Sequence, residues 1–246
     1  KEVIIIESNV NNGLANSVIN GVTEVFTKHD KIIVLEDDLI TARNFLRYMN
    51  AALNKYTPSA QVMEIAGFSF EANGIVKNNA SFFLPITTSW GWGTWKRVWN
   101  KFDIRAIGYE KLKTDIQLKA RFDMDDSYPY SRMLIQQMET TSIDSWAIRF
   151  WWHVFKNNGI TLFPDQSLIK NIGYGTDGTH TSGNDPFPVN NFDLFYSIDN
   201  FPCEIKVNEG FYSHIKHYFR NKKGSVSNIK EPFLKKIILY LKKWGI

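Results

Sequence analysis

The strongest restriction on the fold comes from a short apolar run that three acids follow directly. Ile32–Leu35 is rich in β-branched residues, a pattern that predicts a strand buried on both faces of a sheet. Glu36, Asp37 and Asp38 come next in the chain. Adjacent carboxylates repel one another, so a divalent cation held by their oxygens would explain the cluster. The alternative is a solvated acidic turn in which Asp38 or Thr41 caps the next helix.

Helical and strand patterns alternate around this run. Val3–Ile6 is predicted to be a buried strand, 14–27 and 41–56 are predicted to be helices, and Val62–Phe68 a further strand. This alternation is typical of an α/β sheet flanked by helices, and its first strand–helix–strand unit predicts a right-handed parallel crossover. Ligands of open α/β sheets bind just beyond the carboxyl ends of strands, where the three acids are expected.

Tryptophan and glycine alternate in the middle of the chain, at Trp90-Gly91-Trp92-Gly93. Glycine lets the backbone approach a ligand closely, and flat indole rings can line that approach. Trp95 and Trp99 are four positions apart, the spacing at which two rings on one helix pack inward together. We therefore assign the first four residues to a binding site, and Trp95 and Trp99 to the core.

Two further residues are candidates for a site. Asp144 precedes a predicted helix, where a carboxylate is stabilised by unpaired backbone N–H groups, so helix capping is an alternative to catalysis. His180 lies in a glycine-rich polar loop, 171–181, that could present its imidazole to a ligand. A lone surface histidine is as often without such a role.

Composition bounds the remaining possibilities. The 246 residues fit one domain, 1–203, with a basic extension, 204–246, that carries ten Lys or Arg against three Glu. The single Cys203 excludes an internal disulfide framework and fits a reducing compartment, so we expect a cytoplasmic location. No apolar run is long enough to span a bilayer, and we expect no nucleic-acid partner.

The end of the basic extension has the pattern of an amphipathic helix. Its apolar residues fall at helical spacing on one face, and its lysines lie off that face. A helix of this kind can lie on an anionic membrane surface, which would place the protein on the inner face of the membrane. The alternative is a helix that packs its apolar stripe on the domain. The apolar positions are Leu234, Ile237, Ile238, Leu241 and Trp244.

Five motifs occur in order along the chain: Gly13–Ser17, Val34–Asp38, Trp90–Trp95, Asp144–Ala147 and Gly178–His180. Together they resemble bacterial glycosyltransferases of the GT-A fold found in surface-polysaccharide gene clusters. More distantly, the layout is similar to the animal N-acetylglucosaminyltransferases that start complex N-glycans, whose metal motif is also Glu-Asp-Asp. The resemblance covers roughly 3–182, and it implies a GT-A-like, Rossmann-like mixed sheet flanked by helices.

The resemblance also implies a donor site. Asp38, with His180, would hold Mn²⁺ or Mg²⁺ bridging the diphosphate of a nucleotide-sugar donor. Glu36 and Asp37 would face the ribose, the sugar or the metal's water shell, and Trp90–Gly93 would line the donor pocket.

The acceptor side follows from the same resemblance. Asp144 would be the general base that takes the proton of an acceptor hydroxyl, and a single base without an enzyme nucleophile implies inversion at the anomeric carbon. The acceptor would be a glycan or a lipid-linked glycan in cell-surface polysaccharide synthesis.

The chain departs from the family pattern at its start. Enzymes of this fold open with a strand, a helix and a second strand that cradle the base and ribose, whereas this chain opens at what matches the third strand. We therefore expect a fragment or a truncated product whose sheet has an open edge. Two alternatives are a non-catalytic saccharide-binding module and an inactive glycosyltransferase fragment. A sugar-nucleotide pyrophosphorylase is a third, but it would need an N-terminal glycine-rich phosphate loop, which the sequence does not show.

Overall fold

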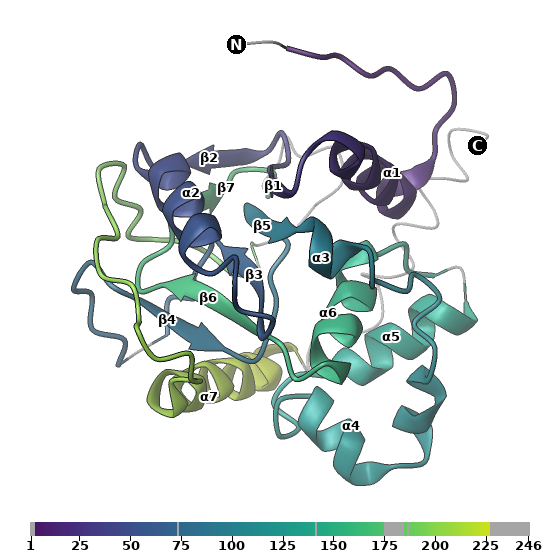
Figure 1. The fold of residues 1–246 in the computed structure, drawn as a ribbon. Helices are drawn as coiled ribbons and strands as arrows, with labels where there is room; N and C mark the ends of the chain where they lie inside the picture. The colour runs from purple at the N-terminus through teal and green to yellow at the C-terminus, as the bar shows by residue number, and fades with distance from the viewer. Residues whose placement is uncertain (1–2, 73, 141, 175–184, 186, 227–246) are drawn as a thin grey trace.

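The computed structural model describes residues 3–72, 74–140, 142–174, 185 and 187–226. The strands of its larger sheet are β1 (Lys31–Val34), β3 (Val62–Ala66), β4 (Ser81–Leu84), β5 (Trp92–Trp95) and β6 (Ile160–Pro164), and a smaller sheet pairs β2 (Leu39–Thr41) with β7 (Ile169–Asn171). The larger sheet has the order β1-β5-β3-β6-β4 (Figure 1). β3 and β6 run parallel and the other neighbouring pairs are antiparallel, so the sheet is mixed.

Helices cover both faces of this sheet, which confirms the predicted α/β class. The helices are α1 (Gly13–Lys28), α2 (Phe45–Lys55), α3 (Lys96–Trp99), α4 (Ile116–Phe122), α5 (Tyr130–Glu139), α6 (Trp146–Lys156) and α7 (Glu209–Val226), with a 3-10 helix, η1 (Tyr109–Lys113). On β5, the ring of Trp92 stacks on Trp146 of α6, with 4.6 Å between ring centroids. A Cβ on the next residue, Gly93, would lie 3.0 Å from Met49 Cε of α2. Successive residues of a strand face opposite sides, so α6 and α2 cover opposite faces.

The helix α7 completes the same core. Figure 1 shows it running beneath β4 and β6, and its Ile215 and Phe219 are fully buried. The Phe219 ring lies 5.2 Å from that of Phe70 and 4.9 Å from that of Tyr128, centroid to centroid. The first part of the basic segment thus shares the core of residues 1–203. The predicted amphipathic stretch, 233–246, lies outside the described residues.

No helix in the described ranges combines the length and the apolar character that crossing a lipid bilayer requires.

The start of the chain differs from the prediction. Val3–Ile6 forms no strand, and its four side chains are 61–84% exposed. In the described sheet, β1 therefore pairs only with β5, antiparallel, and the expected parallel crossover is not formed. The prediction that β1 is buried on both faces was also wrong, because an edge strand is only half-buried. An apolar β-branched run becomes a strand only where another strand is available to pair with it.

Candidate functional site

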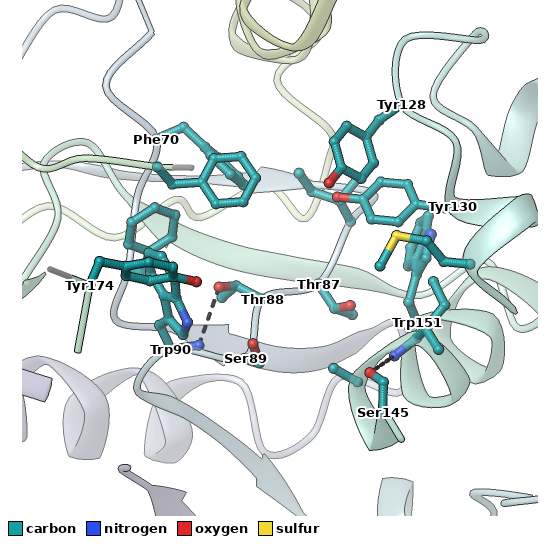
Figure 2. A pocket seen from close by; sticks show the side chains of 16 residues that line it. Phe70, Thr87, Thr88, Ser89, Trp90, Tyr128, Tyr130, Ser145, Trp151 and Tyr174 are labelled. Atoms are coloured by element: carbon teal, nitrogen blue, oxygen red, sulfur yellow. Dashed lines mark hydrogen bonds between the residues drawn. The ribbon is translucent and has the colours of Figure 1, made fainter. Parts of the chain in front are cut away.

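An aromatic pocket of about 260 Å³ opens beyond the carboxyl end of β3. Eight of its sixteen lining residues are aromatic, and the hydroxyl-bearing residues Thr87, Thr88 and Ser89 lie among them. Figure 2 shows Trp90 and Tyr174 on one side, with Tyr130, Trp151 and Ser145 on the other. Apolar ring faces beside a few polar groups are the usual lining of a site for a small organic ligand. The aromatic residues are Phe68, Phe70, Trp90, Tyr128, Tyr130, Trp151, Tyr174 and Phe187.

A buried acid supports the loop that lines the floor of this pocket. Glu64 on β3 is 0% exposed, and its Oε1 accepts a hydrogen bond from the Thr88 N–H at 2.9 Å. Burial raises the pKa of Glu64 well above its ordinary value, although the Thr88 bond acts in the opposite direction. Burial therefore favours the neutral, protonated form of this carboxyl. The sequence does not indicate this role of Glu64, because the residue is an isolated Glu inside a strand pattern.

The acidic turn, Glu36–Asp38, lies near Tyr174, one of the residues that line the pocket. Asp37 is exposed, whereas Glu36 and Asp38 are half-buried. Burial, followed by the charges of Asp38 and Asp37, raises the pKa of Glu36. Burial, followed by the charges of Asp185, Asp38 and Glu36, raises the pKa of Tyr174 to about 12, so these acids lie near this pocket residue. The turn is thus a region of negative charge at the edge of the pocket.

The pairing of β2 with β7 explains how the turn is held. The Ile172 N–H donates to the Asp38 carbonyl at 2.9 Å, and a Cβ on Gly173 would overlap the Asp38 carboxylate. Helix α2 begins only at Phe45, after an N-cap residue, Asn44, whose side chain makes no capping bond. The alternative in which Asp38 or Thr41 caps the next helix is therefore wrong.

The oxygen atoms of this turn fit a hard divalent cation. Asp38 Oδ1 is buried, and within the described residues it has no hydrogen-bond partner. A cation would satisfy this oxygen and remove the repulsion that raises the pKa of Glu36. Among the residues with described positions, no three His, Cys, Asp or Glu side chains converge on one point. The other predicted metal ligand, His180, lies outside the described residues.

The tryptophan–glycine block divides between pocket and core. Trp90 is half-buried and lines the pocket, with its ring centroid 4.9 Å from Phe68 and 5.9 Å from Tyr174. Gly91 follows it at a φ of 61°, where a Cβ would lie 2.6 Å from Ile169 Cδ1, so only glycine fits this turn into β5.

The rest of the block, Gly91 included, does not line the pocket. Trp92 is 0% exposed and Gly93 is buried, both inside β5, so the prediction that these two residues line the donor site disagrees with the structure. The reason is that the block enters the sheet at Trp92, where side chains face the two helix layers. Trp95 and Trp99 are 2% and 5% exposed, which confirms their assignment to the core.

Asp144 does not line the pocket itself but is next in the chain to a residue that does. It precedes Ser145, which lines the pocket and whose Oγ accepts from the Ile148 N–H as the N-cap of α6. Asp144 caps a different helix, because its Oδ2 accepts from the Ala15 N–H of α1 at 3.3 Å. Gly13 makes room for this contact: its φ is 74°, and a Cβ there would lie 2.7 Å from Asp144 Oδ2.

The structure places Glu36 and Asp38 close enough to the pocket residue Tyr174 to raise its pKa, and Asp144 next in the chain to the pocket residue Ser145, but none of these three acids lines the pocket itself. Tyr174 and the Thr87–Ser89 loop were not predicted as site residues, because nothing local in the sequence distinguishes them. No family model matches the chain, and no curated protein matches its sequence.

Proposed function

We propose that this chain is a metal-dependent glycosyltransferase, which moves a sugar from a nucleotide-sugar donor to a glycan or lipid-linked acceptor. The observation that carries the proposal is a ring-lined pocket that has Glu36 and Asp38 near its residue Tyr174 and Asp144 next in the chain to its residue Ser145. Sugar transfer needs a positively charged group at the leaving diphosphate and a base at the acceptor hydroxyl. In this proposal the mixed sheet is part of a GT-A fold.

The donor side of the proposal rests on the acidic turn. Asp38 and Glu36 would hold Mn²⁺ or Mg²⁺, and the cation would neutralise charge developing on the diphosphate leaving group. His180, outside the described residues, is a further proposed ligand. Trp90 and Tyr174 offer ring faces next to this turn, on which the C–H face of a sugar can stack.

The acceptor side rests on Asp144. Its Oδ2 is held by the Ala15 N–H, and the residue itself is exposed, so the carboxylate is fixed in place and open to solvent. It would take the proton of the acceptor hydroxyl while that oxygen attacks the anomeric carbon, and the bond to the diphosphate breaks on the opposite face. The product sugar is then inverted, and the proton resides on Asp144 until it is lost to water.

The experiment that tests the donor site is calorimetry with uridine and guanosine diphosphates, with and without Mn²⁺. We expect binding that needs the metal, and we expect Asp38→Asn to weaken it. Asp30→Asn is a matched control, because it removes the same charge from an exposed residue outside the acidic turn. Equal affinities of the parent and the Asp38 variant in Mn²⁺ would contradict the proposal.

A second function is favoured by the ring-lined pocket itself. A non-catalytic saccharide-binding module would use the rings of Trp90 and Tyr174, bind glycans without metal and tolerate Asp38→Asn. Hydrolysis and transfer assays with nucleotide-sugars separate the two functions, because a binding module gives no release of nucleoside diphosphate.

A further inference from the structure

A second cavity, of about 270 Å³, shares Phe70 as a lining residue with the aromatic pocket. One wall is the segment after β3, with Ser69, and the other is the segment after β6, with Asp165 and Gln166. These two strands are the parallel pair of the described sheet. The carboxyl end of neighbouring parallel strands is where open α/β sheets bind ligands. The two segments stay joined beyond the strands, since the Leu168 N–H donates to the Gly67 carbonyl at 2.9 Å.

The lining of this cavity is polar, unlike that of the aromatic pocket. Seven of its eleven lining residues have polar or charged side chains. Ser69 is 2% exposed, and its Oγ has no hydrogen-bond partner within the described part of the chain. A buried hydroxyl without a partner is uncommon, and it is explained when a ligand or water supplies the missing bond.

The other polar groups form a fixed frame around Ser69. Asp165 is 3% exposed; its Oδ2 accepts from the backbone N–H groups of Asn78 and Ala80, and its Oδ1 accepts from the Tyr196 hydroxyl. Gln166 Nε2 donates to the Asn191 carbonyl at 3.0 Å.

The charged side chains of the lining restrict the class of ligand that this cavity can bind. Glu71 and Asp165 bring two negative charges to the lining and Lys77 brings one positive charge. Both Glu71 oxygens already accept hydrogen bonds, from the Asn190 side chain and the Asn191 N–H. An anion would be repelled, and the carboxylates are already occupied by protein donors, which disfavours a metal ion. Once anions and metal ions are excluded, the polar lining matches a neutral ligand with several hydroxyl groups.

We propose that this cavity binds one neutral sugar ring of a saccharide whose neighbouring ring occupies the aromatic pocket. Phe70, 7% exposed, lines both spaces, so the two are adjacent. The inference that the ligand is a saccharide rests on the proposed function, whereas the inference that a second site exists rests on the residues that line the cavity. A saccharide of two or more rings would therefore bind more tightly than a single ring.

The test is ligand-observed NMR with methyl glycosides of glucose, galactose and N-acetylglucosamine, and with the disaccharides cellobiose, lactose and diacetylchitobiose. We expect Ser69→Ala to weaken the binding of at least one disaccharide about threefold to tenfold, the effect of one hydrogen bond, and to leave monosaccharide binding unchanged. The matched control is Ser127→Ala, which removes another buried hydroxyl that has no partner in the described residues but lines neither cavity. Both variants should keep the parent's melting temperature, because neither hydroxyl makes a bond in the described part of the fold.

Equal disaccharide binding by the parent and Ser69→Ala would overturn the second site, as would equal losses in both variants. Failure of every saccharide to bind the parent would overturn it too. All measurements are made without metal or nucleotide and are repeated in Asp38→Asn. Failure of the proposed function would appear separately, as nucleotide binding that does not depend on metal.

Discussion

Asp144 Oδ2 accepts a hydrogen bond from the backbone N–H of Ala15, 129 residues earlier in the chain. The contact joins the first turn of α1 to the residue before the N-cap of α6, which places a carboxylate next to the pocket residue Ser145. A carboxylate at a helix N-terminus is stabilised by the unpaired N–H groups there. One side chain can therefore act both as a cap and as a base, and the two roles can be separated by mutation.

Asp144→Asn should lower turnover of a nucleotide-sugar about 10²-fold or more, because the amide cannot take a proton. The amide oxygen still accepts from the Ala15 N–H, so the melting temperature should change little. Asp144→Ala should lose both roles, with a loss of about 1 kcal/mol in unfolding free energy. Turnover and thermal melting of both variants are the measurements. If the Asn variant retains turnover and the Ala variant only loses stability, Asp144 is a cap alone.

Two glycines of α1 should respond in opposite directions to alanine. Gly13→Ala should destabilise the chain by about 1–2 kcal/mol, because its φ is 74° and the new Cβ would overlap Asp144 Oδ2. Gly21 lies in the same helix, and an alanine Cβ there would meet no neighbouring side chain within 4 Å. Gly21→Ala should stabilise by about 0.5–1 kcal/mol. Denaturant unfolding of both variants measures the difference, and a stabilised Gly13→Ala would contradict the geometry at Asp144.

Glu64 should make the protein less stable as the pH rises. Its pKa is raised in the folded chain above the ordinary value of 4.5, so above that pH the unfolded chain loses a proton that the folded chain keeps. The unfolding free energy should fall by up to about 1.4 kcal/mol per pH unit from this group. Glu64→Gln, which keeps the acceptor for the Thr88 N–H, should remove the slope that begins above pH 4.5. Urea unfolding above that pH is the measurement, with the exposed Glu24→Gln as control; an unchanged slope would contradict a protonated Glu64.

His153 should make the protein less stable as the pH falls. Burial, with a smaller effect of Lys156, lowers its pKa from 6.5 to about 4. Between these values the unfolded chain binds a proton that the folded chain does not, so stability is lost as pH falls, by up to about 3 kcal/mol. His153→Phe keeps a ring beside Phe102 and Phe150 and should flatten the loss. Melting temperatures from pH 4.5 to 7 check this, and the exposed His29→Phe should leave the pH dependence unchanged.

The basic end of the chain, outside the described residues, gives a fifth prediction. The full chain should float with anionic vesicles at low salt, because each lysine near such a surface contributes about 1 kcal/mol. A version ending at Lys230 should remain in solution. If both versions float equally, or neither floats, the amphipathic stretch is not a membrane anchor.

The α/β class was predictable because local periodicity alone distinguishes helices from strands. Trp95 and Trp99 are buried as predicted, but the two do not share a helix as their spacing suggested, because Trp95 ends β5 and Trp99 lies in α3. Trp92 could not be separated from Trp90, because whether a ring faces a helix layer or a pocket depends on where β5 begins. The run Val3–Ile6 was mistaken for a strand because its apolar pattern does not reveal whether a partner strand is present.

The site was predictable only where chemistry is concentrated in a short stretch. Three consecutive acids after an apolar run are visible in sequence, whereas the Glu64 support of Thr88 joins residues 24 positions apart. Tyr174 belongs to the site only because β7 pairs with β2 and carries it beside Asp38. Contacts of this kind are decided by tertiary packing, which no local pattern encodes.

The contacts of Phe219 determine when the aromatic pocket can be completed during synthesis of the chain. This ring lies against Phe70, Tyr128 and Phe187, three walls of the aromatic pocket that come from separate parts of the chain. Chains are synthesised from the N-terminus, and domains can begin to fold while synthesis continues. The sheet strands and the acidic turn precede α7 in that order. The pocket therefore gains its last wall support only after Phe219 has left the ribosome, when nearly all of the described chain is already free to fold.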